Sequence, residues 1–209
     1  TVTDAPTEPD AETLLRQRAQ ALLDGMTAQE RVCQLFIVTP QSLTNGEAVT
    51  EANDALREAL ERLPVGGIIC FADNLESREQ TAQLIAGAQR FSRIPLFIGV
   101  DEEGGLVARV SDKLGTTAFA PMAQYGAAGD AGAVRDAGAT IAADISAFGF
   151  NLDFAPVADV VTNPNNREIG NRSFSSDPAV AAEMVAAMVD GLQSGGVLSC
   201  LKHFPGHGS

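Results

Sequence analysis

Short, uninterrupted apolar runs alternate with segments of helical spacing along this chain, and this alternation is the strongest constraint on its fold. The apolar runs predict strands at residues 35–38, 68–71, 95–100, within 151–157 and at 197–201. The intervening spacing predicts helices at residues 11–23, 45–63, 77–91, 131–148 and 177–193, and a further short helix after a capping box at Thr27 and Glu30. Strands that are apolar on both faces and joined through helices are typical of a parallel sheet covered by helices.

Two stretches, residues 112–129 and 159–176, have no clear period and are predicted to be long loops, the first with at most a helical turn. Loops of this length in a compact domain usually carry function. The chain of 209 residues holds five strand–helix units, without a helix after the fifth strand. An eight-unit barrel needs about 250 residues. We therefore expect residues 11–209 to be one incomplete domain, preceded by a polar tether at residues 1–10.

Composition excludes several classes of protein. Asp and Glu outnumber Lys and Arg by 27 to 14, which gives a net charge of −13 and argues against a nucleic-acid partner. No apolar run approaches the roughly 18 residues of a membrane span. Cys33, Cys70 and Cys200 have no C-x-x-C spacing and are interpreted as core thiols. The polar, proline-bearing start is typical of a trimmed chain or of a mature exported protein, which favours the cell envelope or secretion over the cytoplasm.

Polar side chains follow two of the predicted strands at the point where each strand ends. Asp101 follows the third strand directly and is succeeded by two glycines and Arg109, while Lys202 and His203 follow the fifth strand. Ligands of α/β sheets and barrels bind at the carboxyl ends of the strands. A carboxylate there can accept hydrogen bonds from two neighbouring hydroxyls, so we interpret these residues as parts of one binding site.

The fourth unit contributes a polar loop with Arg167 and Arg172. Each arginine is either a solvated surface charge or the partner of a carboxylate or a ligand oxygen, for which its planar fork is well suited. Asp153 lies inside an apolar strand and needs a partner if it is buried. We interpret Asp153 and Asp159 as structural residues that accept hydrogen bonds from backbone amides.

Metal and cofactor sites are not expected. His203 and His207 are four residues apart, but Pro205 and Gly206 lie between them and prevent the helix that would bring two metal ligands onto one face. No glycine-rich segment has the spacing of a phosphate-binding loop.

Six segments together resemble the N-terminal barrel domain of family 3 glycoside hydrolases, over about residue 22 to residue 209. In chain order they are LLDGMTAQERVCQLF, GGIICF, IGVDEEGG, FNLDFAPVADV, IGNRSFSSD and KHFPGHG. The last segment, with a strand before it, is the most specific. Its form is similar to the β-N-acetylhexosaminidase branch of the family, whereas the β-glucosidase branch usually departs from it after Lys-His-Phe.

This resemblance implies an α/β fold of the TIM-type (β/α)8 barrel, of which the chain holds about the first five strand–helix units. It also implies removal of terminal N-acetylglucosamine from β-linked glycans, often cell-wall fragments, with retention of configuration. The family's sugar-binding positions fall on Asp101, Arg109, Arg172, Lys202 and His203. Asp101 would hold sugar hydroxyls, and Arg172, Lys202 and His203 would donate to hydroxyl oxygens. At position 106 this chain has leucine, where many members carry a basic residue.

In this branch the nucleophile is an aspartate on a later strand, and the acid/base is a histidine paired with an aspartate on the loop after KHFPGHG. Histidine suits that role because its ordinary pKa lies near neutrality. Both positions would lie beyond Ser209, so the resemblance implies a sugar-binding half-site here and a catalytic pair in the remaining C-terminal part of the barrel. A β-glucosidase-type member, a phosphorylase of similar architecture and a non-catalytic sugar-binding or structural barrel protein are the alternatives.

Overall fold

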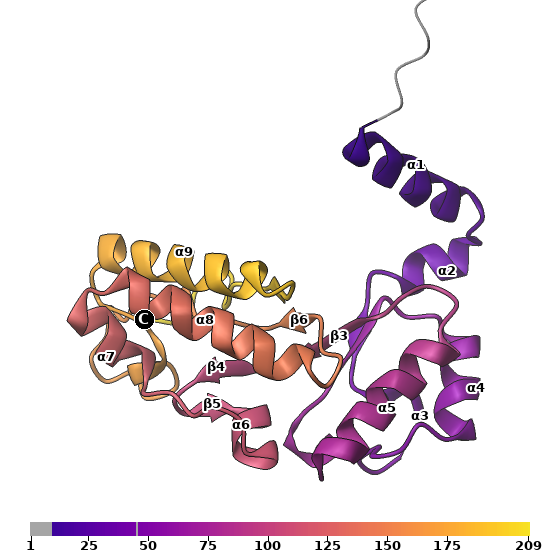
Figure 1. The fold of residues 1–209 in the computed structure, drawn as a ribbon, viewed down its shortest axis with the longest axis horizontal. Coiled ribbons are helices and arrows are strands. Elements are labelled where there is room, and N and C mark those ends of the chain that lie inside the picture. Colours follow the sequence, from indigo (N-terminus) through magenta and orange to yellow (C-terminus); the bar gives the residue numbers. More distant parts are fainter. Residues whose placement is uncertain (1–9, 45) are drawn as a thin grey trace, which may run out of the picture.

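The computed structural model describes residues 10–44 and 46–209, so residues 1–9 of the expected tether lie outside the described residues. One or more helices separate the strands of the main sheet along the chain (Figure 1). In chain order they are α1 (Ala11–Asp24), α2 (Ala28–Cys33), β1 (Ile37–Val38), α3 (Pro40–Thr44), α4 (Asp54–Arg62), β2 (Gly67–Ile69), the 3₁₀ turn η1 (Ala72–Asn74), α5 (Arg78–Phe91), β3 (Phe97–Val100), β4 (Glu102–Gly104), β5 (Val107–Ala108), α6 (Arg109–Leu114), α7 (Met122–Ala128), α8 (Ala131–Ser146), β6 (Leu152–Asp153), the 3₁₀ turn η2 (Gly170–Arg172), α9 (Pro178–Ser194) and β7 (Leu198–Ser199).

A five-stranded parallel sheet organises the chain, with strand order β1-β2-β3-β6-β7. The order of the strands in this sheet is therefore their order along the chain, and the connections between them run through helices. The first units of a TIM-type barrel have the same arrangement. In the register of the sheet, Ile68 lies opposite both Val38 and Ile98, and Asp153 lies opposite both Val100 and Ser199. The predicted strands at residues 35–38, 68–71, 95–100, 151–157 and 197–201 are all present, although each is shorter than its apolar run.

The hydrophobic core lies between this sheet and the helices. Ile68 and Ile98 are fully buried on the strands, and Leu56 of α4, Leu84 of α5 and Ile145 of α8 are as deeply buried on the helices. A second, two-stranded antiparallel sheet, β4-β5, follows β3 immediately. It lies outside the parallel sheet and carries part of the polar site described below.

Helices α8 and α9 lie side by side in Figure 1, and glycines allow their close approach. A Cβ atom at Gly191 of α9 would lie 2.2 Å from the Arg135 carbonyl oxygen, and one at Gly138 of α8 would lie 2.7 Å from that of Met188. A side chain at either position would therefore collide with backbone of the other helix. Small residues fix how closely the two helices pack.

Helix α1 extends away from the rest of the described chain (Figure 1). Asp10 caps it by accepting a hydrogen bond from the Thr13 amide, yet none of its residues is buried. Leu14, Leu15 and Leu22 are exposed on it. In the described part of the chain, no helix combines the length and the apolar character that a membrane span requires.

Two sequence predictions need correction. The predicted helix at residues 45–63 begins at Asp54, because the Asn53 side chain accepts from the Leu56 amide and caps the helix there. The predicted loop at residues 112–129 contains α7 and the end of α6. The sequence of helix α7 has little amphipathic pattern, so the helix depends on tertiary packing. It packs closely on the Phe174 backbone, since a Cβ at Gly126 would lie 1.8 Å from the Phe174 carbonyl oxygen.

Candidate functional site

The site lies where β3, β6 and β7 end. Asp101 follows the last residue of β3, and the chain after β7 continues beside the segment that follows β6. Lys202 donates its amide to the Pro156 carbonyl at 3.2 Å, and its own carbonyl accepts from the Ala158 amide at 2.7 Å. This backbone pairing, centred on a bridge between Val157 and Lys202, holds the Lys202 side chain beside the end of β3.

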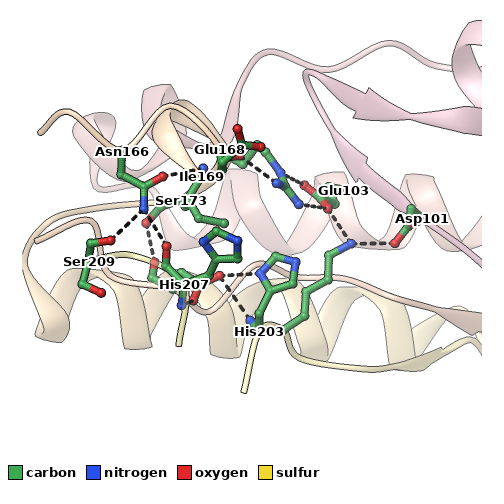
Figure 2. Close-up of polar contacts among 12 residues, drawn as sticks. Asp101, Glu103, Asn166, Glu168, Ile169, Ser173, His203, His207 and Ser209 are labelled. Carbon is green, nitrogen blue, oxygen red and sulfur yellow. Dashed lines mark hydrogen bonds and ion pairs between the residues drawn. The ribbon is translucent and has the colours of Figure 1, made fainter. Parts of the chain in front are cut away.

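Four charged side chains form a continuous cluster there (Figure 2). Lys202 Nζ lies 2.6 Å from Asp101 Oδ1 and 2.5 Å from Glu103 Oε1. Arg172 of η2 binds Glu103 through two parallel hydrogen bonds from one edge of its guanidinium, with Nε donating to Oε2 and Nη2 to Oε1, each at 2.8 Å. Two cations thus face two carboxylates, and Glu103 bridges the cations. We call Asp101, Glu103, Arg172 and Lys202 the charged cluster.

Burial makes this cluster rigid and strongly coupled. The Glu103 side chain is 1% exposed, and the other three are 13–15% exposed. Desolvation alone would raise the pKa of Glu103, but hydrogen bonds and charge from Arg172 and Lys202 outweigh it and hold that pKa below its ordinary value. Glu103 in turn raises the pKa of the Arg172 guanidinium. These two pKa shifts favour the charged states of Glu103 and Arg172.

The β4-β5 hairpin places Asp101 and Glu103 on the same side. The turn contains Gly104 and Gly105, both with positive φ (81° and 64°), and a Cβ at Gly105 would lie 2.7 Å from Pro121 Cα. Glu102 points the other way: its buried carboxylate accepts from the Val110 amide at 2.6 Å and the Ser111 amide at 3.0 Å. Glu102 thereby caps helix α6 and anchors the hairpin.

A second cluster surrounds Asp159. Its Oδ2 lies 2.6 Å from His203 Nδ1 and accepts from the His203 amide at 3.2 Å, while its Oδ1 accepts from the His207 amide at 2.6 Å. The Asp159 side chain is 1% exposed and that of His203 is 33% exposed. Asn166 adds a bond from its side-chain amide to the His207 carbonyl at 2.6 Å. One buried carboxylate therefore holds the turn that contains both histidines.

An open hollow of about 580 Å³ adjoins both clusters. Asp159, Lys202 and His203 line it, together with residues of the segments that follow β6 and β7. Lys202 therefore reaches both this hollow and Asp101. Lys202 is the member of the charged cluster that lines the hollow, and Asp101, Glu103 and Arg172 lie behind it. The two positive and two negative charges of the cluster balance. Such a site suits an uncharged ligand with several hydroxyl groups.

Arg109 is placed differently from the other predicted site residues. Its amide donates to the Asp101 carbonyl at 3.4 Å, and it begins helix α6. Among the described residues its side chain forms no ion pair with the charged cluster, and its Nε is buried without a hydrogen-bond partner. Arg167 likewise remains outside the charged cluster, in the loop before η2.

Two further residues, Glu103 and Asp159, belong to the site although no motif in the sequence marks them as ligand-binding residues. Glu103 lies two residues after Asp101 in the segment IGVDEEGG. Its signal was the alternation of an extended segment, which puts residues 101 and 103 on one face. Asp159 was interpreted as structural, and its bonds to the His203 and His207 amides confirm this; its side-chain contact with the His203 ring was not predicted. Asp153 also accepts a backbone amide, that of Glu102, at 2.9 Å.

Five parallel strands in sequential order, helices between them and a polar site at their carboxyl ends make this chain part of a TIM-type α/β barrel. Residues 27–209 match the glycosyl hydrolase family 3 N-terminal domain. The chain belongs to this family.

Known proteins of the family resemble the chain over most of its length. It is 41% identical to beta-hexosaminidase A of Pseudoalteromonas piscicida over 169 residues, and this matched region covers 77% of this chain and 28% of that protein. It is 39% identical over 170 residues to a beta-hexosaminidase of Xanthomonas oryzae pv. oryzae, covering 78% and 50%. The chain thus spans between about a quarter and a half of these curated relatives.

Solved structures agree with the fold. A family 3 beta-N-acetylglucosaminidase from Paenibacillus sp. superposes with a TM-score of 0.79 at 37% identity, over 88% of this chain and 34% of that one. NagZ from Neisseria gonorrhoeae superposes with a TM-score of 0.73 at 34% identity, over 82% and 49%. The sequence-based assignment to the β-N-acetylhexosaminidase branch is confirmed by these relatives.

Proposed function

We propose that the intact protein is a retaining glycoside hydrolase that removes terminal β-linked N-acetylglucosamine from glycans or cell-wall fragments. The observation that carries this proposal is the charged cluster at the ends of β3 and β7. Lys202 contacts Asp101 at 2.6 Å although the two residues lie far apart in the chain. The relatives named beta-hexosaminidase and beta-N-acetylglucosaminidase support the same activity.

In this proposal Asp101, Arg109, Arg172, Lys202 and His203 bind the sugar. Asp101 uses one carboxylate oxygen for Lys202 and has the other for a hydroxyl. Lys202 and Arg172 donate to hydroxyl oxygens from positions that Glu103 fixes. Arg109 has a buried Nε without a hydrogen-bond partner, so its contribution depends on a ligand or a water reaching that atom.

Residues 11–209 form, in the same proposal, the N-terminal part of the barrel domain, and further strands complete it. The greater length of the relatives supports this assignment. So do the apolar side chains at both outer strands: Leu35 and Phe36 before β1 are 82% and 53% exposed, and Leu198 and Leu201 near β7 are 49% and 50% exposed. The aspartate nucleophile and the histidine acid/base belong to those further strands and loops.

The test compares two chromogenic substrates on the intact protein, the para-nitrophenyl β-glycosides of N-acetylglucosamine and of glucose. We expect hydrolysis of the first at a rate well above the second, without a requirement for phosphate, and proton NMR should show the β-anomer of the sugar released first. Preference for the glucoside would identify the β-glucosidase alternative, and phosphate-dependent turnover a phosphorylase. Sugar binding without hydrolysis would identify a non-catalytic barrel protein.

A further inference from the structure

Asp159 is a buried carboxylate that is not among the expected sugar-binding residues, yet it contacts the ring of one of them, His203. Three donors converge on it: the His203 amide, the His207 amide and His203 Nδ1. Desolvation would raise the pKa of Asp159, but these hydrogen bonds, with the His203 ring foremost, hold that pKa below its ordinary value. Asp159 is therefore ionised near neutral pH.

An ionised carboxylate can only accept hydrogen bonds. Because His203 Nδ1 lies 2.6 Å from Asp159 Oδ2, this ring nitrogen must carry a proton. In the neutral imidazole the other nitrogen, Nε2, then has a free lone pair. Among the described residues Nε2 makes no hydrogen bond, and Figure 2 shows the His203 ring with its contact to Asp159. His203 also lines the open hollow.

We propose that Asp159 is a positioning residue that holds His203 in the Nδ1–H tautomer, so that the neutral ring accepts a hydrogen bond from a sugar hydroxyl through Nε2. This rests on the proposed function of the site. It assigns His203 a role opposite to the donor role that the family resemblance implies. Lys202 and Arg172 can only donate, so an accepting His203 gives the site a second acceptor besides Asp101.

The division between donors and acceptors has a consequence for ligand recognition. A sugar hydroxyl both donates and accepts, and it is fully satisfied only when one neighbour does each. Lys202 and His203 are adjacent in the chain and both line the hollow, one as donor and the other as acceptor. A sugar hydroxyl between them would accept a hydrogen bond from Lys202 and donate one to His203, which fixes the orientation of the hydroxyl. A sugar analogue without that hydroxyl would lose both hydrogen bonds.

The first experiment measures the tautomer directly. The intact protein is labelled with 15N-histidine, and the His203 ring signals are assigned by their loss in a His203→Gln variant. The expected spectrum at pH 8 shows a protonated Nδ1 and an unprotonated Nε2 for His203, before any ligand is added. An unprotonated Nδ1 would overturn the proposal. This result is independent of sugar binding, so it also stands if the proposed function fails.

The second experiment is a double-mutant cycle on the affinity for N-acetylglucosamine. Asp159→Asn is expected to weaken binding at least about 10-fold in the wild-type background, as for loss of a hydrogen bond to a charged group. His203→Gln replaces the ring with an amide that does not depend on Asp159. In that background Asp159→Asn is expected to change the affinity less than about 3-fold.

An equal effect of Asp159→Asn in both backgrounds would overturn the proposal, because it would make Asp159 a purely structural residue. Asp144→Asn serves as the matched control, since Asp144 also accepts a backbone amide, that of Thr117, outside the site. It should leave the affinity unchanged. Absence of N-acetylglucosamine binding by the wild type would instead overturn the proposed function and the acceptor role, while the NMR spectrum still decides the tautomer.

Discussion

The pKa values of buried carboxyl groups in this chain are shifted in opposite directions, depending on what each carboxyl group contacts. Glu103 faces two cations, and its pKa lies below the ordinary value. Glu102, the preceding residue, is equally buried but accepts only from backbone amides, and desolvation raises its pKa to about 7. Asp153 is completely buried, and desolvation raises its pKa well above the ordinary value. Neighbouring carboxyls therefore divide into one whose pKa is lowered by ion pairs and two whose pKa values are raised by burial.

Glu102 predicts a specific pH dependence of stability. Its pKa is higher in the folded than in the unfolded state, so its contribution is fully present below about pH 4.5 and is lost as the pH rises through 7. The corresponding change in the free energy of unfolding is on the order of 3 kcal/mol. We expect Glu102→Gln to reduce the loss of stability between pH 5 and pH 8, as measured by urea unfolding. Part of the pH dependence of stability should remain in this variant, because burial also raises the pKa of Asp153.

Glu58→Gln is the control for this prediction, because Glu58 is an exposed carboxylate on α4. It should leave the difference in stability between pH 5 and pH 8 as in the wild type. An unchanged slope in Glu102→Gln would show that burial of Glu102 does not control the pH response.

Substitution of Glu103 by glutamine is expected to lower both the stability of the protein and its affinity for the sugar. Glu103→Gln leaves Arg172 and Lys202 without their shared counter-charge, and breaking such a buried pair costs about 3 kcal/mol. Chemical unfolding should show that decrease, and calorimetry should show weaker N-acetylglucosamine binding by the intact protein. Glu183→Gln, at an exposed position on α9, is the control and should change neither quantity. Unchanged affinity in Glu103→Gln would mean that the two cations do not need Glu103 for their positions.

At the scale of elements, close packing of α8 against α9 supports the half of the sheet that contains β6 and β7. The packing depends on glycines at the crossing rather than on large apolar side chains. Gly191→Ala would place a methyl group 2.2 Å from the Arg135 carbonyl oxygen. We expect it to lower the free energy of unfolding by about 3 kcal/mol, since backbone of one helix must move. Thermal and urea unfolding measure the effect.

Gly132→Ala is the matched substitution in the first turn of α8. There the added Cβ would meet a side-chain oxygen of Asp130 at 3.2 Å, which can shift. It should leave stability within about 1 kcal/mol of the wild type, because alanine favours the helix. Equal losses for Gly132→Ala and Gly191→Ala would refute the role of the helix crossing.

Elements with strong local signals could be predicted from the sequence. The helices predicted at residues 77–91 and 177–193 are α5 and α9: Ser77 caps α5 in a capping box, and Asp177 caps α9 with Pro178 at its first position. Hairpin β4-β5 and helix α7 could not be predicted, because their formation depends on distant partners: Pro121 beside Gly105, and Phe174 beside Gly126. The same holds for Glu103, whose function depends on a lysine and an arginine from other units.

At the scale of the molecule, the sheet order brings together side chains that are widely separated in the sequence. Asp101 and Lys202 are 101 positions apart and form a direct ion pair, because β6 lies between β3 and β7 and all three strands run in parallel. The predicted approach of Asp101 to Lys202 is therefore observed. The excess of acidic residues, with a net charge of −13, does not extend to the charged cluster, in which the charges balance.

A crystal structure of the intact protein with N-acetylglucosamine would test the central claim most directly. The account predicts one sugar ring at the carboxyl ends of β3 and β7, with hydroxyls within hydrogen-bond distance of Asp101, Lys202 and His203 Nε2. A sugar bound at another place, with Lys202 still paired to Asp101, His203 still paired to Asp159 and all of them remote from the sugar, would contradict the account.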